Sequence, residues 1–541
     1  MFQTEILKKV RNNPNSFASE SDIKSELYSF KINEELFNNK FTEPKLFKNY
    51  DDKGKAGVPL FYDETEKRLF VDHTDKHSLI IGSTGSKKSR LLAMPSVYSI
   101  GCGKESMIIS DPKAEIFLKT SDYLKKQGYQ VLAINLREPM HGVGWNPLAV
   151  PYKWYLAGNI DKAYEFANDI AINLTQGSKS NPDPFWENSA GSFFFGLMLL
   201  LFKYCKEQGM PSEYVNISNI MQLRNAMCSV NPSTIKHNIW WRYAKTDSFI
   251  TSTLIGTIET ANATRAGILS TFDQNMRALA IQPSLLNMLA HNNIDYDSIA
   301  EKPTAIFLIV PDEKTGYHSL VSLFVKQSYE YLVYRAQQKI AQGKKLKNRV
   351  NYILDEFSSL PTINDFPAMI TAARSRNIRF NLFLQSKHQL YLRYSEEANT
   401  IMANCENWIF LTSREIVFLR EISELCGEIA NSQGKLLLTT SELQRLDKSS
   451  GEALVLHGRA KPFISRLADI DELCSIGASF SFEKYDHPKC ILIDFNSKEH
   501  IEVVRKLIPK EVEQIISDSD IQVQNLFEKL ENMKPLSEKN N

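Results

Sequence analysis

The chain has 541 residues, more than one ordinary hydrophobic core holds, so its length predicts two or three domains. Its 64 lysines and arginines balance 63 aspartates and glutamates, which excludes nucleic-acid binding through overall positive charge and leaves only a local basic patch or lumen. Seven scattered cysteines without a CxxC pair argue against a disulfide framework or a zinc site and favour reduced thiols in the cytosol.

The N-terminal region, residues 1–55, is polar and charged, and we expect a short helical or partly disordered arm. Its first twenty residues lack the apolar core and cleavage site of a signal peptide. The apolar run FFFGLMLLLF at 193–202 covers only about half of the ~20 residues that cross a bilayer. We therefore expect a buried helix there, no transmembrane helix, and a cytoplasmic location.

Short apolar runs begin near residue 60 and are typical of strands buried on both faces of a parallel sheet. They lie at 77–82, 105–111, 129–135, 304–311, 350–356, 378–385, 407–413 and 452–458. Between the two sets, helical patterns such as DKAYEFANDIAINL fill the chain. This order predicts an α/β domain in two parts, 56–150 and 301–475, around an inserted all-α domain, 151–300. Residues 476–541 are predicted to add one strand and two or three helices as a C-terminal appendage.

The segment IIGSTGSKKSRL at 80–91 nearly matches the phosphate-binding pattern GxxxxGK[ST]. In such a loop, backbone N–H groups converge on phosphates at a helix N-terminus, where the helix dipole also favours anions. Lys88 stands at the position of the phosphate-reaching lysine and Ser89 at that of the magnesium-binding hydroxyl. The predicted phosphate-binding residues are Gly82, Ser83, Thr84, Gly85, Ser86, Lys87, Lys88 and Ser89.

Lys87 replaces the second glycine of this pattern, and a Cβ there risks crowding or an unfavourable dihedral angle. Three interpretations remain open. The lysine is tolerated if its φ stays negative and its side chain points to solvent or to the phosphates; it weakens nucleotide binding; or it marks a loop that no longer supports hydrolysis.

Two acidic residues end the predicted strand VNYILDE, at the edge of the sheet where open α/β proteins bind ligands. Asp355 is predicted to hold magnesium, directly or through water, and Glu356 to orient and deprotonate the attacking water. An acidic strand end alone is common, and its combination with the upstream loop favours a nucleotide site.

Three further candidate residues follow in TAARSRNIRFNLFLQS. Arg374 and Arg376 lie at a probable helix end and are candidates for the arginine that stabilises γ-phosphate charge in a neighbouring subunit of ring ATPases. Gln385 ends the next strand, where it can sense that phosphate. Their spacing after the acidic pair favours these roles over ordinary surface positions.

Several motifs together resemble the type IV secretion coupling proteins of bacterial conjugation, the TraG/TraD group. They occur in order, from about residue 60 to 470: the loop at 82–89, SDPKAE at 110–115, WNPL at 145–148, DPFWENSA at 183–190, ILDEFSSL at 353–360, ARSRNIRF at 373–380, QSKHQL at 385–390 and SELQRL at 441–446.

This resemblance implies a RecA-like P-loop nucleotide-binding domain with an inserted all-α domain, assembled as a hexameric ring at the inner face of the membrane. It implies ATP and Mg²⁺ as cofactors, and a relaxase–DNA complex or protein substrate, single-stranded DNA and type IV secretion channel proteins as partners. The same site residues take the roles given above, and of the two candidate arginines the resemblance implies Arg374. Members usually carry N-terminal transmembrane helices, which this sequence lacks, so a small membrane-anchoring partner is expected.

Candidate DNA contacts are local. Arg374, Arg376 and Arg379 gather on one segment, and GKKLKNR at 343–349 is a basic run, although a solvated loop is the favoured interpretation of that run. The aromatic pairs Phe185-Trp186 and Trp240-Trp241 are expected in the core of the helical domain rather than as base-stacking surfaces.

Three functions fit this sequence. The first is an ATP-driven coupling motor of conjugation, and the second is a substrate-docking receptor with weak or no ATPase activity because of Lys87. The third, a related ring ATPase that pumps double-stranded DNA or energises secretion assembly, is disfavoured by the DPFW, WNPL and SDPK motifs.

Overall fold

The computed structural model describes residues 9–10, 13, 16–32, 53–175, 184–228, 235–311, 313–343, 345–430, 432, 434–473 and 482–510. These residues form two compact units. The first unit takes the chain up to Trp145 and again from Asn292 to His487, and the second takes Asn146 to His291 and the chain from Pro488 onward. The domain boundaries predicted at residues 150, 300 and 475 remain proposals, because the two units are defined by how the chain packs and not by function.

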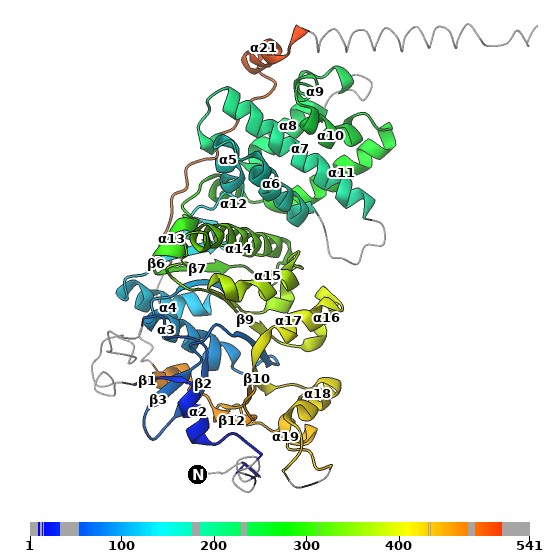
Figure 1. Ribbon diagram of the computed structural model, residues 1–541. Coiled ribbons are helices and arrows are strands. Elements are labelled where there is room, and N and C mark those ends of the chain that lie inside the picture. Colours follow the sequence, from blue (N-terminus) through cyan, green and yellow to red (C-terminus); the bar gives the residue numbers. More distant parts are fainter. Residues whose placement is uncertain are drawn as a thin grey trace, which may run out of the picture. The chain divides into compact units, whose positions relative to one another are not determined.

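Within the described residues, the first unit is built on a nine-stranded sheet with the order β12-β11-β10-β4-β9-β8-β5-β7-β6 (Figure 1). The strands from β10 to β6 run parallel, and the hairpin β11–β12 adds two antiparallel strands at one edge. Each of the eight apolar runs between 77 and 458 that were expected as strands forms a strand of this sheet, and among them only β11 departs from the expected parallel direction. The strands are β4 (His77–Gly82), β5 (Ser106–Ser110), β6 (Gln130–Asn135), β7 (Thr304–Ile309), β8 (Val350–Leu354), β9 (Ile378–Leu384), β10 (Cys405–Thr412), β11 (Glu452–His457) and β12 (Phe463–Arg466).

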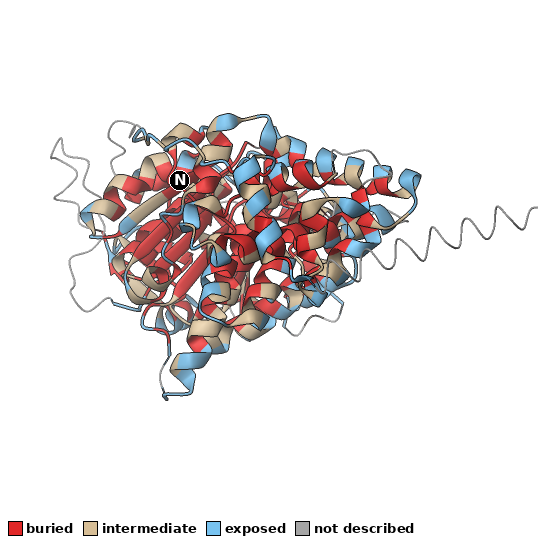
Figure 2. Ribbon diagram, turned by 90° about the horizontal axis from the view of Figure 1, so that it is seen from above, coloured by how far each residue is buried: buried red, intermediate tan, exposed pale blue. Residues whose placement is uncertain are grey.

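Helices cover both faces of this sheet, which explains why its central strands are apolar throughout. Ile80, Met107 and Phe307 point to the face packed by α3 and α4. Tyr352 and Phe380 point to the other face, toward α14 and α15, and Figure 2 shows the strands as buried. The helices of this unit are α2 (Glu20–Glu26), the π-helical turn η2 (Ser89–Ala93), α3 (Met94–Cys102), α4 (Glu115–Lys126), α13 (Tyr296–Glu301), α14 (His318–Ile340), α15 (Phe366–Ala373), α16 (Lys387–Tyr394), α17 (Glu397–Ala403), α18 (Ile416–Cys426), α19 (Thr440–Gln444) and α20 (Ile470–Leu473).

A second, three-stranded antiparallel sheet joins part of the N-terminal arm to the first unit. It has the order β1-β3-β2, with β1 (Tyr28–Lys31), β2 (Pro59–Asp63) and β3 (Arg68–Val71). Phe30 and Phe70 are buried in the same core as α3. The arm therefore includes an ordered strand that its polar composition did not predict.

Helices are the regular elements of the second unit within its described residues, in agreement with the predicted all-α segment. Its longest helix, α7, contains the whole apolar run at 193–202, every residue of which is buried, so the predicted buried helix is confirmed. Of the described helices, this one alone has the length and composition to cross a membrane, and 61% of its most apolar stretch is buried inside the protein. The main helices are α5 (Ala149–Leu156), α6 (Ile160–Thr175), α7 (Phe185–Glu207), α8 (Ile217–Cys228), α9 (Ile239–Ala244), α10 (Ser248–Ile258), α11 (Asn262–Ala280), α12 (Pro283–Ala290) and α21 (Lys498–Leu507).

The C-terminal run KCILIDF, predicted as a strand, does not pair with any described strand, and this prediction is wrong. Its backbone groups bind side chains of the helical unit instead of a neighbouring strand. These bonds run from Cys490 N–H to Asn287 Oδ1 (2.9 Å), from Ile493 N–H to Asn219 Oδ1 (2.8 Å) and from Trp240 Nε1–H to Phe495 O (3.0 Å). One helix, α21, follows, and the remaining helices predicted there fall outside the described residues.

Candidate nucleotide-binding site

Three neighbouring parallel strands, β4, β9 and β8, bring the predicted site segments to one edge of the sheet. The loop from Ser83 follows β4, Gln385 follows β9, and Asp355 and Glu356 follow β8. All of them line one cavity of about 520 Å³, together with the loop residues through Ser89. The structure therefore gathers most of the predicted site in one place, since carboxyl ends of adjacent parallel strands meet at a common edge.

Gly82 and Lys88 close the base of the loop. Lys88 Nζ donates a hydrogen bond to the carbonyl oxygen of Gly82 at 2.5 Å, and the lysine side chain is buried. Burial lowers the pKa of Lys88, against the attraction of Glu356 and Asp355. A Cβ on Gly82 would lie 2.4 Å from Ser86 Oγ, so this position requires glycine. The buried Ser86 Oγ has no hydrogen-bond partner among the described residues, as expected for a group that awaits a ligand.

Lys87 has a φ of +64°, in the left-handed region that glycine adopts readily and lysine does not. The interpretation that required a negative φ is therefore wrong. Its backbone takes the conformation that the missing glycine would take, next to Gly85 at +76°. The side chain is 36% exposed, and its Nζ lies 3.7 Å from Asp469 Oδ2.

Asp355 and Glu356 form an acidic pair at the end of β8. Ser89 Oγ donates to Asp355 Oδ2 at 3.3 Å, and the Glu356 N–H donates to Asp355 Oδ1 at 3.0 Å. Burial, together with the charge of Glu356, raises the pKa of Asp355 to about 6. Within the described part of the chain, Glu356 Oε2 is buried without a partner. This donor set of hydroxyl and carboxylate oxygens fits a magnesium ion and a water molecule.

Gln385 lies across the loop from the acidic pair. Thr84 Oγ1 donates to Gln385 Oε1 at 3.3 Å, which joins the loop to the end of β9.

Arg374 lies outside this cavity, before the amino-terminal end of β9, whereas the cavity lies at the carboxyl ends of the strands. It begins the short helix η8 (Arg374–Arg376) ahead of β9, at the predicted helix end, and β9 then runs for seven residues, about 23 Å, to the cavity edge. Its guanidinium binds Glu406 and also Asp75, at 3.2 Å, and its side chain is 40% exposed. Arg374 therefore does not reach the cavity of its own chain, and its contacts within the chain are the ion pairs with Glu406 and Asp75.

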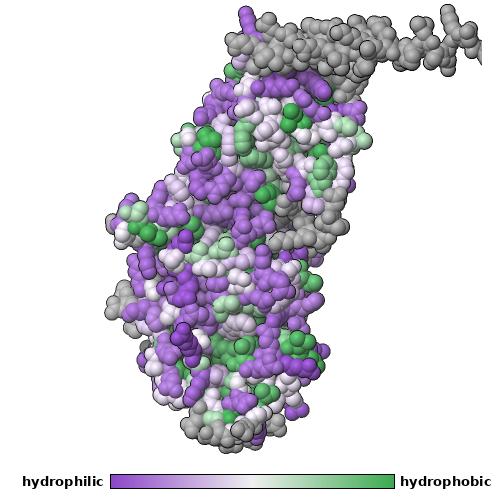
Figure 3. Space-filling model, turned by 45° about the vertical axis from the view of Figure 1, so that its right-hand side comes forward, coloured by the Kyte–Doolittle hydropathy of each residue, from purple (hydrophilic) through white to green (hydrophobic). Residues whose placement is uncertain are grey.

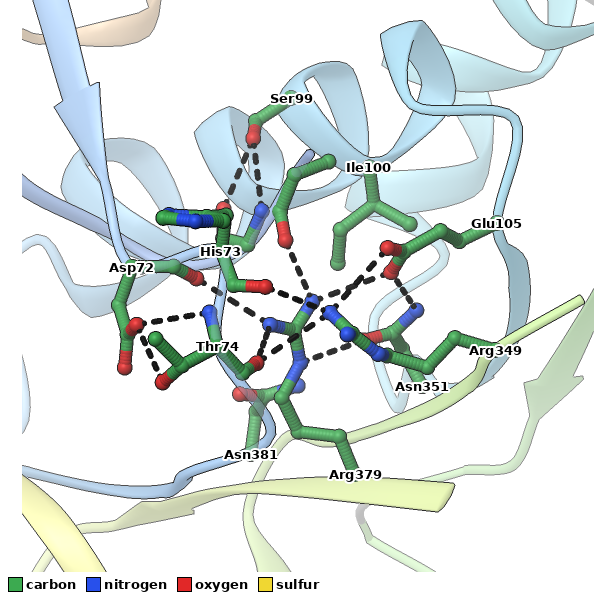
Figure 4. Close-up of polar contacts among 12 residues, drawn as sticks. Asp72, His73, Thr74, Ser99, Ile100, Glu105, Arg349, Asn351, Arg379 and Asn381 are labelled. Atoms are coloured by element: carbon green, nitrogen blue, oxygen red, sulfur yellow. Dashed lines mark hydrogen bonds and ion pairs between the residues drawn. The ribbon is translucent and has the colours of Figure 1, made fainter. Parts of the chain in front are cut away.

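Arg379, grouped with Arg374 and Arg376 as a candidate DNA contact, is buried and cannot serve in that way. Figure 4 shows its guanidinium surrounded by acceptors beneath the loop that precedes β4. It donates to Asn351 Oδ1 at 2.7 Å and to Thr74 O at 2.8 Å, and it pairs with Glu105 at 3.2 Å. The sequence missed this role because an arginine at an alternating strand position is usually exposed, and only its buried partners make it structural.

The two aromatic pairs and the basic run at 343–349 differ in their burial. Trp240 and Trp241 are buried, as expected, whereas Phe185 and Trp186 are 48% and 37% exposed and are not core residues. The described part of the run at 343–349 is a loop between α14 and β8 with exposed Lys345 and Lys347, in agreement with the favoured interpretation.

Eight residues that line the cavity were not predicted, and four of these carry ionisable side chains: Arg90, Lys113, Glu115 and His318. Lys113 and Glu115 belong to the SDPKAE motif, where Asp111 Oδ2 accepts the Phe117 N–H at 2.7 Å and holds this turn. Burial raises the pKa of Asp111 to about 7. The motif was the signal for these two residues, but no sequence signal connects His318, at the start of α14, with this site.

Known proteins share the sequence pattern and the fold of this chain. The sequence profile of the family described as type IV secretory system conjugative DNA transfer matches residues 29–450. No curated protein sequence matches the chain. Among solved structures, the plasmid coupling protein TrwB in complex with the non-hydrolysable ATP analogue ADPNP is similar, with a TM-score of 0.54, 16% identity, and coverage of 84% of this chain and 96% of that one. TrwB in complex with ADP and Mg²⁺ is similar with a TM-score of 0.52 and 16% identity, and the match covers 85% of this chain and 95% of that one. This degree of identity supports a common fold.

Proposed function

Because the chain belongs to the conjugative DNA transfer family of type IV secretory systems, we propose that it is a coupling ATPase that recruits a relaxase–DNA or protein substrate to the conjugation channel. One observation carries the enzymatic part of this proposal. The Ser89–Asp355 contact and the unpartnered Glu356 Oε2 lie in the same cavity as the loop residue Lys88.

The predicted site residues that line the cavity each have a role in this mechanism. The loop backbone from Gly82 to Ser89 and the Lys88 ammonium bind the phosphates of ATP. Ser89 and Asp355 hold Mg²⁺, which neutralises phosphate charge when it is bound. Glu356 orients a water molecule and accepts its proton, and Gln385 contacts the γ-phosphate. The nucleotide complexes of TrwB, which shares this fold, support ATP and Mg²⁺ as the ligands.

We also propose that the active form is a homo-hexamer, because Arg374 is half-exposed and too far from its own cavity. Exposed apolar side chains on α16 and α18, such as Leu392 and Val417, support an assembly surface. Figure 3 shows apolar groups set among hydrophilic residues on one face of the molecule. Partners in this proposal are single-stranded DNA, channel proteins and a small membrane-anchoring protein, which would hold the ring at the inner face of the cell membrane.

DNA-stimulated hydrolysis of ATP tests the proposal. We expect the wild-type protein to hydrolyse ATP faster with single-stranded DNA, Lys88→Ala to lose nucleotide binding, and Glu356→Gln to bind ATP but hydrolyse it at least about 100-fold more slowly. Glu66→Gln, which changes an exposed carboxylate on the β2–β3 turn, serves as the control and should behave as wild type. A wild-type protein that hydrolyses no ATP with DNA present would refute the motor.

The second candidate function is a substrate-docking receptor with weak ATPase activity. The observation that favours it is the lysine itself, whose backbone is strained at a φ of +64° where the loop pattern has glycine. The variant Lys87→Gly distinguishes the two candidates. Its affinity for nucleotide should rise strongly if the protein is a receptor and change little if it is a motor.

A further inference from the structure

Asp469, just after β12, holds two of the cations that line the nucleotide cavity. Its carboxylate makes a bidentate contact with Arg90: Nε lies 3.1 Å from Oδ2, and Nη2 binds Oδ1. Lys87 Nζ lies 3.7 Å from the same carboxylate. Although partial burial alone would raise it, the hydrogen bond from Arg90 holds the pKa of Asp469 below its usual range, so the group is an anion at neutral pH.

Lys87 and Arg90 both line the cavity, whereas Asp469 does not. The two cations therefore have a second possible partner, the phosphates of a bound nucleotide. One carboxylate cannot keep both contacts unchanged while a polyphosphate with several negative charges attracts the same cations, and it also repels that ligand directly. Arg90 is further engaged by Asp471 Oδ2 at 2.5 Å, so two carboxylates reduce its available charge.

We propose that Asp469 is an internal anion that restrains Lys87 and Arg90 and lowers the affinity of the cavity for polyphosphates, and that a nucleoside triphosphate draws both cations away from it. This inference rests on the proposed nucleotide site. It gives the departure of Lys87 from the loop pattern a function: the lysine connects the loop to the segment that leads from β12 into α20. Displacement of that segment would raise nucleotide affinity.

Asp469→Asn tests the inference with little change in shape. Asp469 Oδ1 accepts the Asp471 N–H at 3.2 Å at the start of α20, and an asparagine oxygen can accept the same bond. We expect the dissociation constants of Mg·ATP and of inorganic tripolyphosphate, measured by calorimetry, to fall by between about threefold and tenfold, the size expected for one partly screened charge. Their dependence on salt should become steeper, a change that a merely structural role would not produce.

Glu472→Gln is the matched control, because it removes one negative charge from α20. Its carboxylate pairs with Arg466 and accepts the Asp469 N–H at 2.8 Å, a bond that a glutamine oxygen can also accept, and these contacts involve neither Lys87 nor Arg90. This variant should leave both affinities unchanged. Asp469→Ser, which also suits a helix start, replaces the asparagine variant if that protein does not fold.

The outcomes separate this inference from the proposed function. If wild-type protein binds Mg·ATP and Asp469→Asn binds it equally or more weakly, the inference fails and the nucleotide site stands. An equal gain in Glu472→Gln also overturns it, because the effect would then be one of overall charge. If neither wild type nor Asp469→Asn binds Mg·ATP or tripolyphosphate, both proposals fall.

Discussion

At the scale of single residues, the loop has two positions that usually require glycine, one because space for a Cβ is short and one because φ is positive. Gly82 has no room for a Cβ beside Ser86, whereas Lys87 has a left-handed backbone that a side chain can adopt at a cost of about 1 to 2 kcal/mol. A Cβ at position 82 would force the Ser86 side chain to shift, whereas Lys87 bears only conformational strain. The loop can therefore lose its second glycine and keep its shape.

Lys87→Gly should raise the free energy of unfolding by about 1 kcal/mol, because glycine removes the left-handed strain. The loop already has the backbone conformation of glycine there, so we expect the dissociation constant of Mg·ATP to change by less than about threefold. Chemical denaturation and calorimetry measure the two effects.

Lys67→Gly is the matched control, since Lys67 also has a positive φ, +52°, but lies on the β2–β3 turn away from the cavity. It should give a similar gain in stability without any change in nucleotide binding. A gain of more than about tenfold in affinity for Lys87→Gly alone would contradict the motor and support the receptor.

At the scale of elements, α16 connects the end of β9 with the loop that carries Glu356. The helix begins just after Gln385, and Ser358, two residues after Glu356, donates from Oγ to Gln389 Oε1 at 3.0 Å. Arg393 Nε lies 3.4 Å from the Ser358 carbonyl oxygen. The helix that begins after Gln385 therefore contacts the segment that follows Glu356 at two points.

Gln389→Ala should lower the turnover number for ATP by about threefold to tenfold, with KM changed less than about twofold, because it loosens the Glu356 loop without touching the phosphate loop. Steady-state kinetics measures the turnover number and KM separately. His388→Ala, an exposed neighbour on the same helix, should leave both constants unchanged. A rise in KM with an unaltered turnover number would show that Gln389 acts on binding instead.

At the scale of the whole molecule, the sheet separates Arg374 from the cavity of its own chain, so the two can act together only between subunits. Mixed assemblies test this arrangement. Arg374→Ala lacks the arginine but keeps an intact cavity, and Glu356→Gln lacks the base but keeps the arginine. Each should be nearly inactive alone, and their mixture should recover activity, because Arg374 of one variant completes the cavity of the other.

Arg376→Ala provides the control for these mixtures, since Arg376 donates to Ala372 O at 2.7 Å within its own helix end. It should remain active alone. Mixtures that stay as inactive as the separate variants, measured as ATP hydrolysis with single-stranded DNA, would contradict a shared site.

The sequence by itself determined the strands of the large sheet except β12, the inserted helical segment and the order of the site residues. Apolar runs such as those of β4 and β8 predict buried strands because burial on both faces leaves a local mark in the sequence. The loop, the acidic pair and Gln385 could likewise be placed at one edge, because each directly follows a strand and parallel strands end together.

Only the tertiary structure decided the left-handed φ of Lys87, the burial of Arg379, the distance of Arg374 from the cavity and the unpaired C-terminal run. Each depends on groups remote in the chain: Asp469 beside Lys87, Glu105 beside Arg379, and helix side chains that replace a partner strand. Composition and periodicity report how a segment is buried. They do not report which distant group it meets, and hydrogen bonds and ion pairs to such groups settle these features.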